Sequence, residues 1–183
     1  MGDPDVHACT RCPALVECRT QIVNGRGAVD AALVLVGEAP GREEDAAGRP
    51  FVGRSGRLLE AALRERGVEP SAVRITNLVR CRPPDNRDPY VAERRHCRVH
   101  LEHELAVVDP EVILTMGRIP TQELLDGSTK VTEAVGSTAS TTLGGSVRTV
   151  VVGLHPAATL YDRSRTADFE AALERALDLA DLV

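Results

Sequence analysis

The chain has 183 residues, of which 43% are hydrophobic and 27% charged, and its formal net charge is −5 at pH 7. These values are those of a soluble globular protein of one domain, long enough to bury a core. With no apolar run of about 20 residues and no basic and apolar leader, the sequence predicts a cytoplasmic protein that does not enter a membrane.

The first half of the chain predicts two strands and two helices. Residues 1–28 are irregular and hold three of the five cysteines. The apolar run at 32–36 predicts a strand that ends in GEAPGREED, and an amphipathic helix follows over 55–68, with Ser55 as its expected N-cap. Residues 73–79 predict the second strand, which leads into the loop CRPPDNRDP. A second helix over 92–108 then stops at Asp109-Pro110.

The second half repeats this alternation. A third strand is expected at 111–117 and a short helix at 119–127. Residues 127–146 are small and polar and predict a mobile loop or a weak hairpin. The last strand is expected at 147–156, and an amphipathic helix over 168–183 closes the chain.

Strands that alternate with helices indicate a parallel sheet covered on both faces. We therefore predict a single α/β domain over 1–183, a three-layer α/β/α sandwich with a central, mainly parallel four-stranded sheet. Ligands of such sheets bind beyond the carboxyl ends of the strands. Three loops follow strand ends, and we expect them to converge on one crevice: GEAPGREED, TNLVRCRPPDNR and GLHPAATL.

Charge is distributed unevenly along the chain. Lysine occurs once, at Lys130, so arginine supplies nearly all of the positive charge. The segment from Arg74 to His100 contains seven arginines and only three acids, Asp85, Asp88 and Glu93. A basic region inside an acidic chain indicates a surface that contacts phosphate.

The cysteines suggest a metal site. Cys9 and Cys12 form a C-x2-C pair, and Cys81 and Cys97 stand far downstream. In a cytosolic protein such cysteines usually bind metal rather than form disulfides, and four thiolates suit tetrahedral zinc or an iron–sulfur cluster equally well. Only for Cys18 do we favour the simpler interpretation of a small buried hydrophobe. The expected site is structural and ties the N-terminus to the loop at 81–89.

GEAPGREED, residues 37–45, resembles a phosphate-binding loop in its position and its glycines. It also carries four carboxylates, Glu38, Glu43, Glu44 and Asp45, which would repel a phosphate. A ligand other than a nucleotide pyrophosphate is therefore expected.

Taken in order, these motifs closely resemble the family 4 uracil-DNA glycosylases, which are base-excision repair enzymes with a [4Fe-4S] cluster. The resemblance runs from Cys9 to about Leu160 and rests on the Cys9/Cys12 pair, GEAPGREED, GRPFVGRSGRLL, TNLVRCRPPDNRDP with Cys97 after it, MGR, and HPA at 155–157. It implies a monomeric enzyme that hydrolyses the N-glycosidic bond of uracil in single- or double-stranded DNA. The cluster ligands would be Cys9, Cys12, Cys81 and Cys97.

The same resemblance assigns roles in the base pocket. Phe51 is similar to the residue that stacks on the flipped uracil, Asn77 to the one that reads its edge, and His155 to the one that hydrogen-bonds O2 as charge builds there. The Asn77 amide can donate to O4 and accept from N3–H, a pattern that cytosine reverses. The structural alternatives are a core phenylalanine, a turn or capping asparagine and a histidine without a role in the site.

In GEAPGREED, backbone N–H groups near Glu38, Ala39 and Gly41 are expected to face the uracil. Many members of the wider superfamily carry a water-activating aspartate at the place of Ala39, and a methyl group cannot act as a base. Glu44 is then the first candidate to position water or to stabilise the oxocarbenium ion, with Glu38 and Asp45 behind it. Asn86 is a candidate for polar contacts near the sugar.

Arg80, Arg82, Arg87 and the loop after His155 are expected to contact the DNA backbone. Leu160 or Tyr161 would fill the gap that the flipped base leaves. In this loop the sequence HPAATLYDR departs from the family pattern, because its arginine comes two residues late.

Two alternatives remain. One is a relative that binds uracil-DNA covalently through a histidine in an inserted segment, and no such insert occurs between Asp45 and Phe51. The other is an iron–sulfur or zinc module that only binds DNA or a polymerase. The joint presence of Phe51, Asn77 and His155 favours the enzyme.

Overall fold

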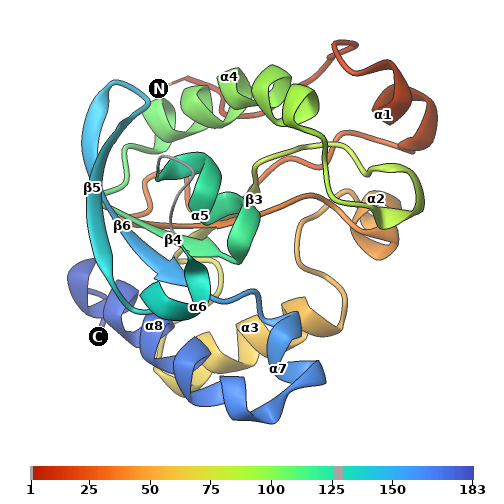
Figure 1. Cartoon of the computed structure of the whole chain (residues 1–183). Coiled ribbons are helices and arrows are strands. Elements are labelled where there is room, and N and C mark those ends of the chain that lie inside the picture. The colour runs from red at the N-terminus through yellow and green to blue at the C-terminus, as the bar shows by residue number, and fades with distance from the viewer. Residues whose placement is uncertain (1, 126–129) are drawn as a thin grey trace.

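The computed structural model describes residues 2–125 and 130–183, which form one six-stranded sheet with helices on both faces (Figure 1). The end of the helix expected at 119–127 and the start of the loop expected at 127–146 lie outside the described residues. The elements are α1 (Pro13–Cys18), β1 (Arg26–Gly27), β2 (Leu33–Gly37), α2 (Arg42–Ala47), α3 (Arg54–Glu65), β3 (Arg74–Asn77), the 3-10 turn η1 (Pro84–Asn86), α4 (Val91–Val108), β4 (Val112–Met116), α5 (Arg118–Leu124), α6 (Val131–Ala134), β5 (Thr138–Leu143), β6 (Ser146–Gly153), α7 (Ala157–Tyr161), the 3-10 turn η2 (Arg163–Arg165) and α8 (Thr166–Leu179).

The strand order is β1-β3-β2-β4-β6-β5, and the four central strands are parallel to one another. The predicted α/β class and the parallel central sheet are thus confirmed. Two antiparallel strands, β1 with two residues and β5 with six, extend the edges beyond the four that were expected. Before β6, the sequence predicted either a mobile loop or a weak hairpin. The antiparallel pairing of β5 with β6 is that hairpin. Most of β5 is exposed, so its sequence lacks the apolar run that marks the central strands.

Strand β2 shows why the central strands are apolar throughout. Leu33 and Leu35 face the core that α3 and α8 cover, whereas Val34 and Val36 face the core that α4 and α5 cover. Successive side chains on a strand point to opposite faces, so a strand between two helical layers must bury both sets. Figure 1 shows these layers, with α4 and α5 on one side of the sheet and α3 and α8 on the other.

The covering helices bury one stripe each. α3 buries Leu59, Ala62 and Leu63, and its first turn differs from the expectation, since Gly53 rather than Ser55 precedes the helix as its N-cap. α8 buries Phe169, Leu173 and Leu177 at helical spacing. No helix in the described part of the chain is long and apolar enough to span a bilayer.

A buried ion cluster joins α4 to β3. Glu104 is fully buried and pairs with Arg74 at 2.8 Å and with Arg80. Arg80 is 2% exposed and also donates to the Thr76 hydroxyl. The expected contact between Arg80 and the DNA backbone is incompatible with this placement, because the guanidinium lies inside the protein.

Candidate active site

A cavity of about 200 Å³ opens where the parallel strands end. Its lining comes from the exit of β2, the end of β3, the exit of β6 and the segment that leads into α3. The lining residues are Ala39, Gly41, Glu44, Phe51, Ser55, Asn77 and His155. The predicted convergence of strand-end loops therefore holds for the three that follow β2, β3 and β6, and Phe51 reaches the same place.

Phe51 and Asn77 meet above Gly37. A methyl group on Gly37 would collide with the Asn77 amide oxygen and lie 2.6 Å from Cζ of Phe51, so this position requires glycine. Asn77 is 2% exposed, yet among residues 2–125 and 130–183 its side-chain amide forms no hydrogen bond. Buried amides are usually satisfied, so the Asn77 amide has both its donor and its acceptor available to a ligand in the cavity.

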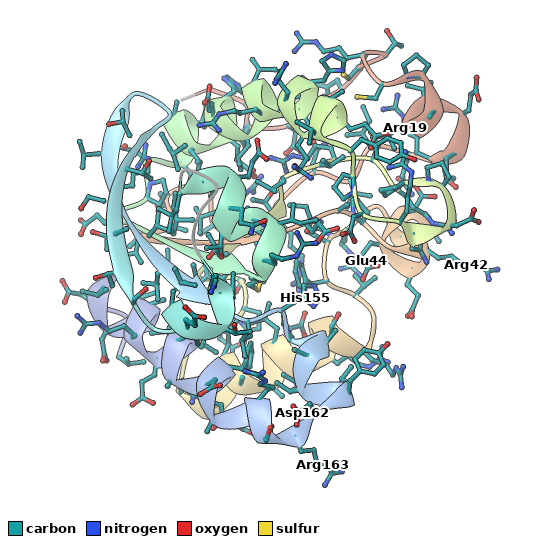
Figure 2. The ribbon with its side chains drawn as sticks, in the orientation of Figure 1. Arg19, Arg42, Glu44, His155, Asp162 and Arg163 are labelled. Carbon is teal, nitrogen blue, oxygen red and sulfur yellow. The ribbon has the colours of Figure 1, made fainter. Side chains whose placement is uncertain are left out.

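His155 packs against Phe51, with ring centroids 5.6 Å apart and the planes inclined by 29°. Its Nδ1 accepts a hydrogen bond from the Ala157 backbone N–H at 3.1 Å, and burial lowers the pKa of His155 below its usual 6.5. The ring is therefore neutral at neutral pH, with its proton on Nε2. Figure 2 shows His155 and Glu44 close together at the carboxyl end of the sheet.

Glu44 is held by main-chain donors. Its Oε1 accepts from the N–H groups of Val52 and Gly53, each at 3.1 Å, and its Oε2 accepts from Gly41 N–H at 3.2 Å. These bonds join the start of α2 to the segment after Phe51. A carboxylate has about four acceptor positions, so Oε2 retains one for a water or a ligand.

Of the other residues of GEAPGREED that were predicted to belong to the site, only some line the cavity. Ala39 and Gly41 line the cavity, but Glu38 is not among its lining residues. Glu38 lies near Asp88 and Arg118, and burial together with Asp88 raises its pKa to about 7. Asp45 is buried on the far side of α2 and forms its bonds with residues of the N-terminal segment.

An outer groove of about 680 Å³ adjoins the cavity and shares Gly41, Glu44 and Ser55 with it. Asn86, Leu160 and Tyr161 lie along this groove rather than in the cavity itself. Tyr161 is 85% exposed and Leu160 is also exposed, at the end of the short helix α7. The two apolar side chains thus stand at the entrance and not in the core.

The arginines near the groove differ from the expected set. Arg82 donates to the Asn86 side chain at 2.7 Å, and Arg87 forms a two-bond ion pair with Glu93, at 2.7 and 2.8 Å. Arg42 and Arg54, at the first positions of α2 and α3, line the groove and form no ion pair within the described residues. Arg42 extends into solvent (Figure 2).

The four cysteines expected to bind metal come together. Cys9, Cys12, Cys81 and Cys97 all line one recess between the N-terminal segment, the loop after β3 and α4, whereas Cys18 does not. All four sulfurs have a nitrogen within hydrogen-bond distance. Cys81 Sγ accepts from Arg19 Nη1 at 2.9 Å and Cys97 Sγ from Arg80 N–H at 3.4 Å, while Cys9 Sγ lies 3.4 Å from His100 Nε2 and Cys12 Sγ lies 3.6 Å from His96 Nδ1. The rest of the lining combines apolar side chains with nitrogen-bearing ones, namely Leu15, Val16, Val79, Arg11, Arg19 and His96.

Burial favours the protonated thiol at three of these cysteines. It raises the pKa of Cys12 and Cys81, and it raises that of Cys97 to about 11. Bound metal would offset this cost, because it favours the thiolate. In the described ranges, no three His, Cys, Asp or Glu side chains stand as a ready site for one ion.

Sequence reasoning missed Ser55, Arg42 and Arg54 as residues of the site. Ser55 was expected to cap α3, but the N-cap lies two residues earlier, at Gly53, and Ser55 lines the cavity from the first turn of the helix. The two arginines lie outside the basic segment from Arg74 to His100. Their position at helix starts beside the glycine-rich motifs is the signal that could have identified them.

Comparisons with known proteins agree with this geometry. Residues 25–177 match the family profile described as the uracil DNA glycosylase superfamily. A type-4 uracil-DNA glycosylase of Thermotoga maritima is 40% identical over 87% of this chain and 81% of its own. Type-4 enzymes of Pyrobaculum aerophilum and Sulfurisphaera tokodaii are 37% and 35% identical over 90% and 96% of this chain, and over 86% and 82% of their own. The chain belongs to the type-4 uracil-DNA glycosylases of that superfamily.

Proposed function

We propose that the protein excises uracil from DNA by hydrolysing the N-glycosidic bond. The observation that carries this proposal is the Asn77 amide, which is buried in a cavity beside Phe51 and His155 with both its donor and its acceptor unused. Uracil presents a carbonyl acceptor at O4 and a donor at N3, which this amide matches. Cytosine presents the reverse pattern and would leave both groups unpaired, at a cost of about 1–3 kcal/mol for each buried group.

The proposed reaction begins with a base turned out of the strand and placed against Phe51. As the glycosidic bond breaks, negative charge develops on uracil O2, and the Nε2–H of neutral His155 is available to donate to it. A preorganised donor of this kind lowers the barrier by roughly 3–4 kcal/mol. The sugar becomes cationic, and the Glu44 carboxylate beside the cavity stabilises that charge and holds the attacking water through its remaining lone pair. The water oxygen bonds to C1′ as the bond to uracil breaks, and the proton that the water releases ends on the departing uracil anion.

Ala39 has no group that could take a proton, so the general base that an aspartate would supply there is absent. The three backbone donors hold the Glu44 carboxylate in one place beside the cavity, which suits it to electrostatic stabilisation and to placing a water. We therefore assign Glu44 to water placement and charge stabilisation.

We propose that Cys9, Cys12, Cys81 and Cys97 hold a [4Fe-4S] cluster. Zinc would require the sulfurs to surround one ion at about 2.3 Å each, whereas the four thiols of a cluster bind different irons and lie farther apart. The nitrogen donors around the sulfurs, which include Arg19 Nη1 at Cys81 and the Arg80 N–H at Cys97, support the cluster. Its chemistry is structural: it would link the N-terminal segment, the loop after β3 and α4.

We propose that the DNA strand occupies the outer groove, with Arg42 and Arg54 in contact with phosphates. Both guanidinium groups lack an acidic partner in the described chain, unlike Arg87, whose charge Glu93 neutralises. Asn86 and Arg82, which bond to each other on the groove's edge, would lie near the sugar of the flipped nucleotide.

The test uses end-labelled single- and double-stranded oligonucleotides that contain one uracil. We expect an abasic site that alkali cleaves, no protein–DNA adduct on a denaturing gel, and about four irons and four sulfides per chain. Asn77→Ala should lower the excision rate by about 100-fold or more while the chain stays folded. Binding without release of uracil, or a covalent adduct, would refute the proposal.

A further inference from the structure

Asp45 is a buried carboxylate next to Glu44 in sequence but directed elsewhere. Both belong to α2, a six-residue helix, where successive side chains diverge by about 100°. Glu44 lines the cavity, whereas Asp45 does not line it and is buried, with only 3% of its surface exposed. No ion pair of Asp45 exists in the described chain, so its charge is balanced by hydrogen bonds alone.

The partners of Asp45 all lie in the N-terminal segment. Both of its carboxylate oxygens accept from the Thr20 backbone N–H at 2.9 Å, and Oδ1 also accepts from Gln21 N–H at 3.4 Å. The Gln21 side chain donates in turn to the carbonyls of Asp45 and Ala46, at 2.8 and 3.2 Å. Thr20 and Gln21 therefore hold α2 in two ways, through the Asp45 carboxylate and through the backbone carbonyls of its last turn.

The residue before Thr20 is fixed to the cysteine recess. Arg19 donates to Cys81 Sγ at 2.9 Å and to the Cys9 carbonyl at 2.8 Å. Figure 2 shows Arg19 on the segment that passes above α2, with Glu44 on the side of α2 that faces His155. One short stretch of chain thus contacts two predicted cluster ligands at one end and the helix of Glu44 at the other.

We propose that Asp45 is a positioning residue for the excision reaction. It fixes α2, and with it Glu44, against a segment that the cysteine site anchors through Arg19. The proposal rests on the proposed function, since Glu44 is the group whose placement matters. Charge-assisted bonds to main-chain N–H groups are short and strong, which suits them to hold a catalytic group within a fraction of an ångström.

The test compares Asp45→Ala, which removes the acceptor, with Asp45→Asn, which keeps one oxygen for Thr20. Asp30→Ala is the matched control, because Asp30 is an exposed carboxylate in the N-terminal part of the chain. For Asp45→Ala we expect kcat to fall by roughly 10- to 100-fold, with KM changed by less than about threefold and iron content retained. Asp45→Asn should recover most of that loss, and Asp30→Ala should match the wild type.

Hydrogen exchange gives a second readout that does not depend on activity. The Thr20 and Gln21 amides should exchange faster in Asp45→Ala, and the Thr20 amide should also exchange faster in Arg19→Gln, because each change releases one end of the segment. Unchanged exchange in either variant, or an unchanged kcat per iron-loaded Asp45→Ala molecule, would overturn the proposal. A wild-type protein that releases no uracil would instead refute the proposed function, and the exchange result would still report on the Asp45 contacts.

Discussion

Phe51 occupies the left-handed region of backbone space, with φ of 55°, which a bulky residue adopts only at a cost of about 1–3 kcal/mol. Neighbouring contacts hold it there. Arg26 donates to the carbonyls of Pro50 and Phe51 and pairs with Glu60 at 2.8 Å. A side chain on Gly56 would overlap the Phe51 carbonyl. The aromatic wall of the cavity is thus set before a base arrives, which reduces the cost of ordering it upon binding.

The lowered pKa of His155 predicts a pH-dependent stability. The folded state favours neutral His155, so its contribution is fully present above the unfolded value of 6.5 and is lost as pH falls toward the lower folded value. Between about pH 7 and about pH 5, the free energy of unfolding should therefore fall more steeply for the wild type than for His155→Gln. Urea unfolding at each pH measures this difference. His103→Gln, which alters an exposed histidine, should keep the wild-type slope, and equal slopes for His155→Gln would contradict the prediction.

At the scale of elements, the short helix α7 presents Leu160 and Tyr161 at the entrance of the site. A wedge is needed only where a base leaves a stacked duplex. Leu160→Ala should therefore slow excision from double-stranded DNA by about tenfold and leave single-stranded DNA nearly unaffected. Single-turnover rates on the two substrates measure the ratio. Val147→Ala, at an exposed position on β6, is the control, and an equal loss on both substrates would exclude a wedge.

Two helices, α2 and α3, begin beside the groove with an arginine each. If Arg42 and Arg54 contact phosphates, replacing either with glutamine should reduce the slope of log affinity against log salt by about 1. Fluorescence anisotropy with an abasic oligonucleotide at several salt concentrations measures the slope. Arg175→Gln removes an exposed arginine of α8 that forms no ion pair with any residue the structure describes, and it should leave the slope unchanged. A wild-type slope in Arg42→Gln would place the strand elsewhere.

For the molecule as a whole, the cluster of Glu104 with Arg74 and Arg80 joins α4 to the sheet. Removal of the acid leaves two buried guanidinium groups with less than their full complement of bonds. Glu104→Gln should lower the free energy of unfolding by about 3–5 kcal/mol. Glu102→Gln breaks a surface pair with Arg98 in the same helix and should cost at most about 1 kcal/mol. Chemical denaturation compares the two, and similar losses would contradict the prediction.

The same cluster marks where sequence reasoning reached its limit. Apolar periodicity was enough to predict the four central strands and the long helices, since each must bury a face of fixed spacing. The strand-end motifs likewise predicted that Asn77 and His155 lie together, and the family resemblance added Phe51 to them. The buried state of Arg80 was not predictable, because its partner Glu104 lies 24 residues away and only the packing of α4 brings them together. Strand β1, two residues long, carries too little pattern to be recognised.

Gly37 lies directly beneath Asn77 and Phe51, two residues that line the base cavity. Because the amide of Asn77 and the ring of Phe51 both rest over that one residue, any side chain introduced there would displace both at once. A substitution at Gly37 therefore cannot change the cavity without also moving Asn77 and Phe51. A version of this enzyme that accepted a larger purine would have to gain its room elsewhere in the lining, as at Ser55, which also borders the outer groove, and keep Gly37 unchanged.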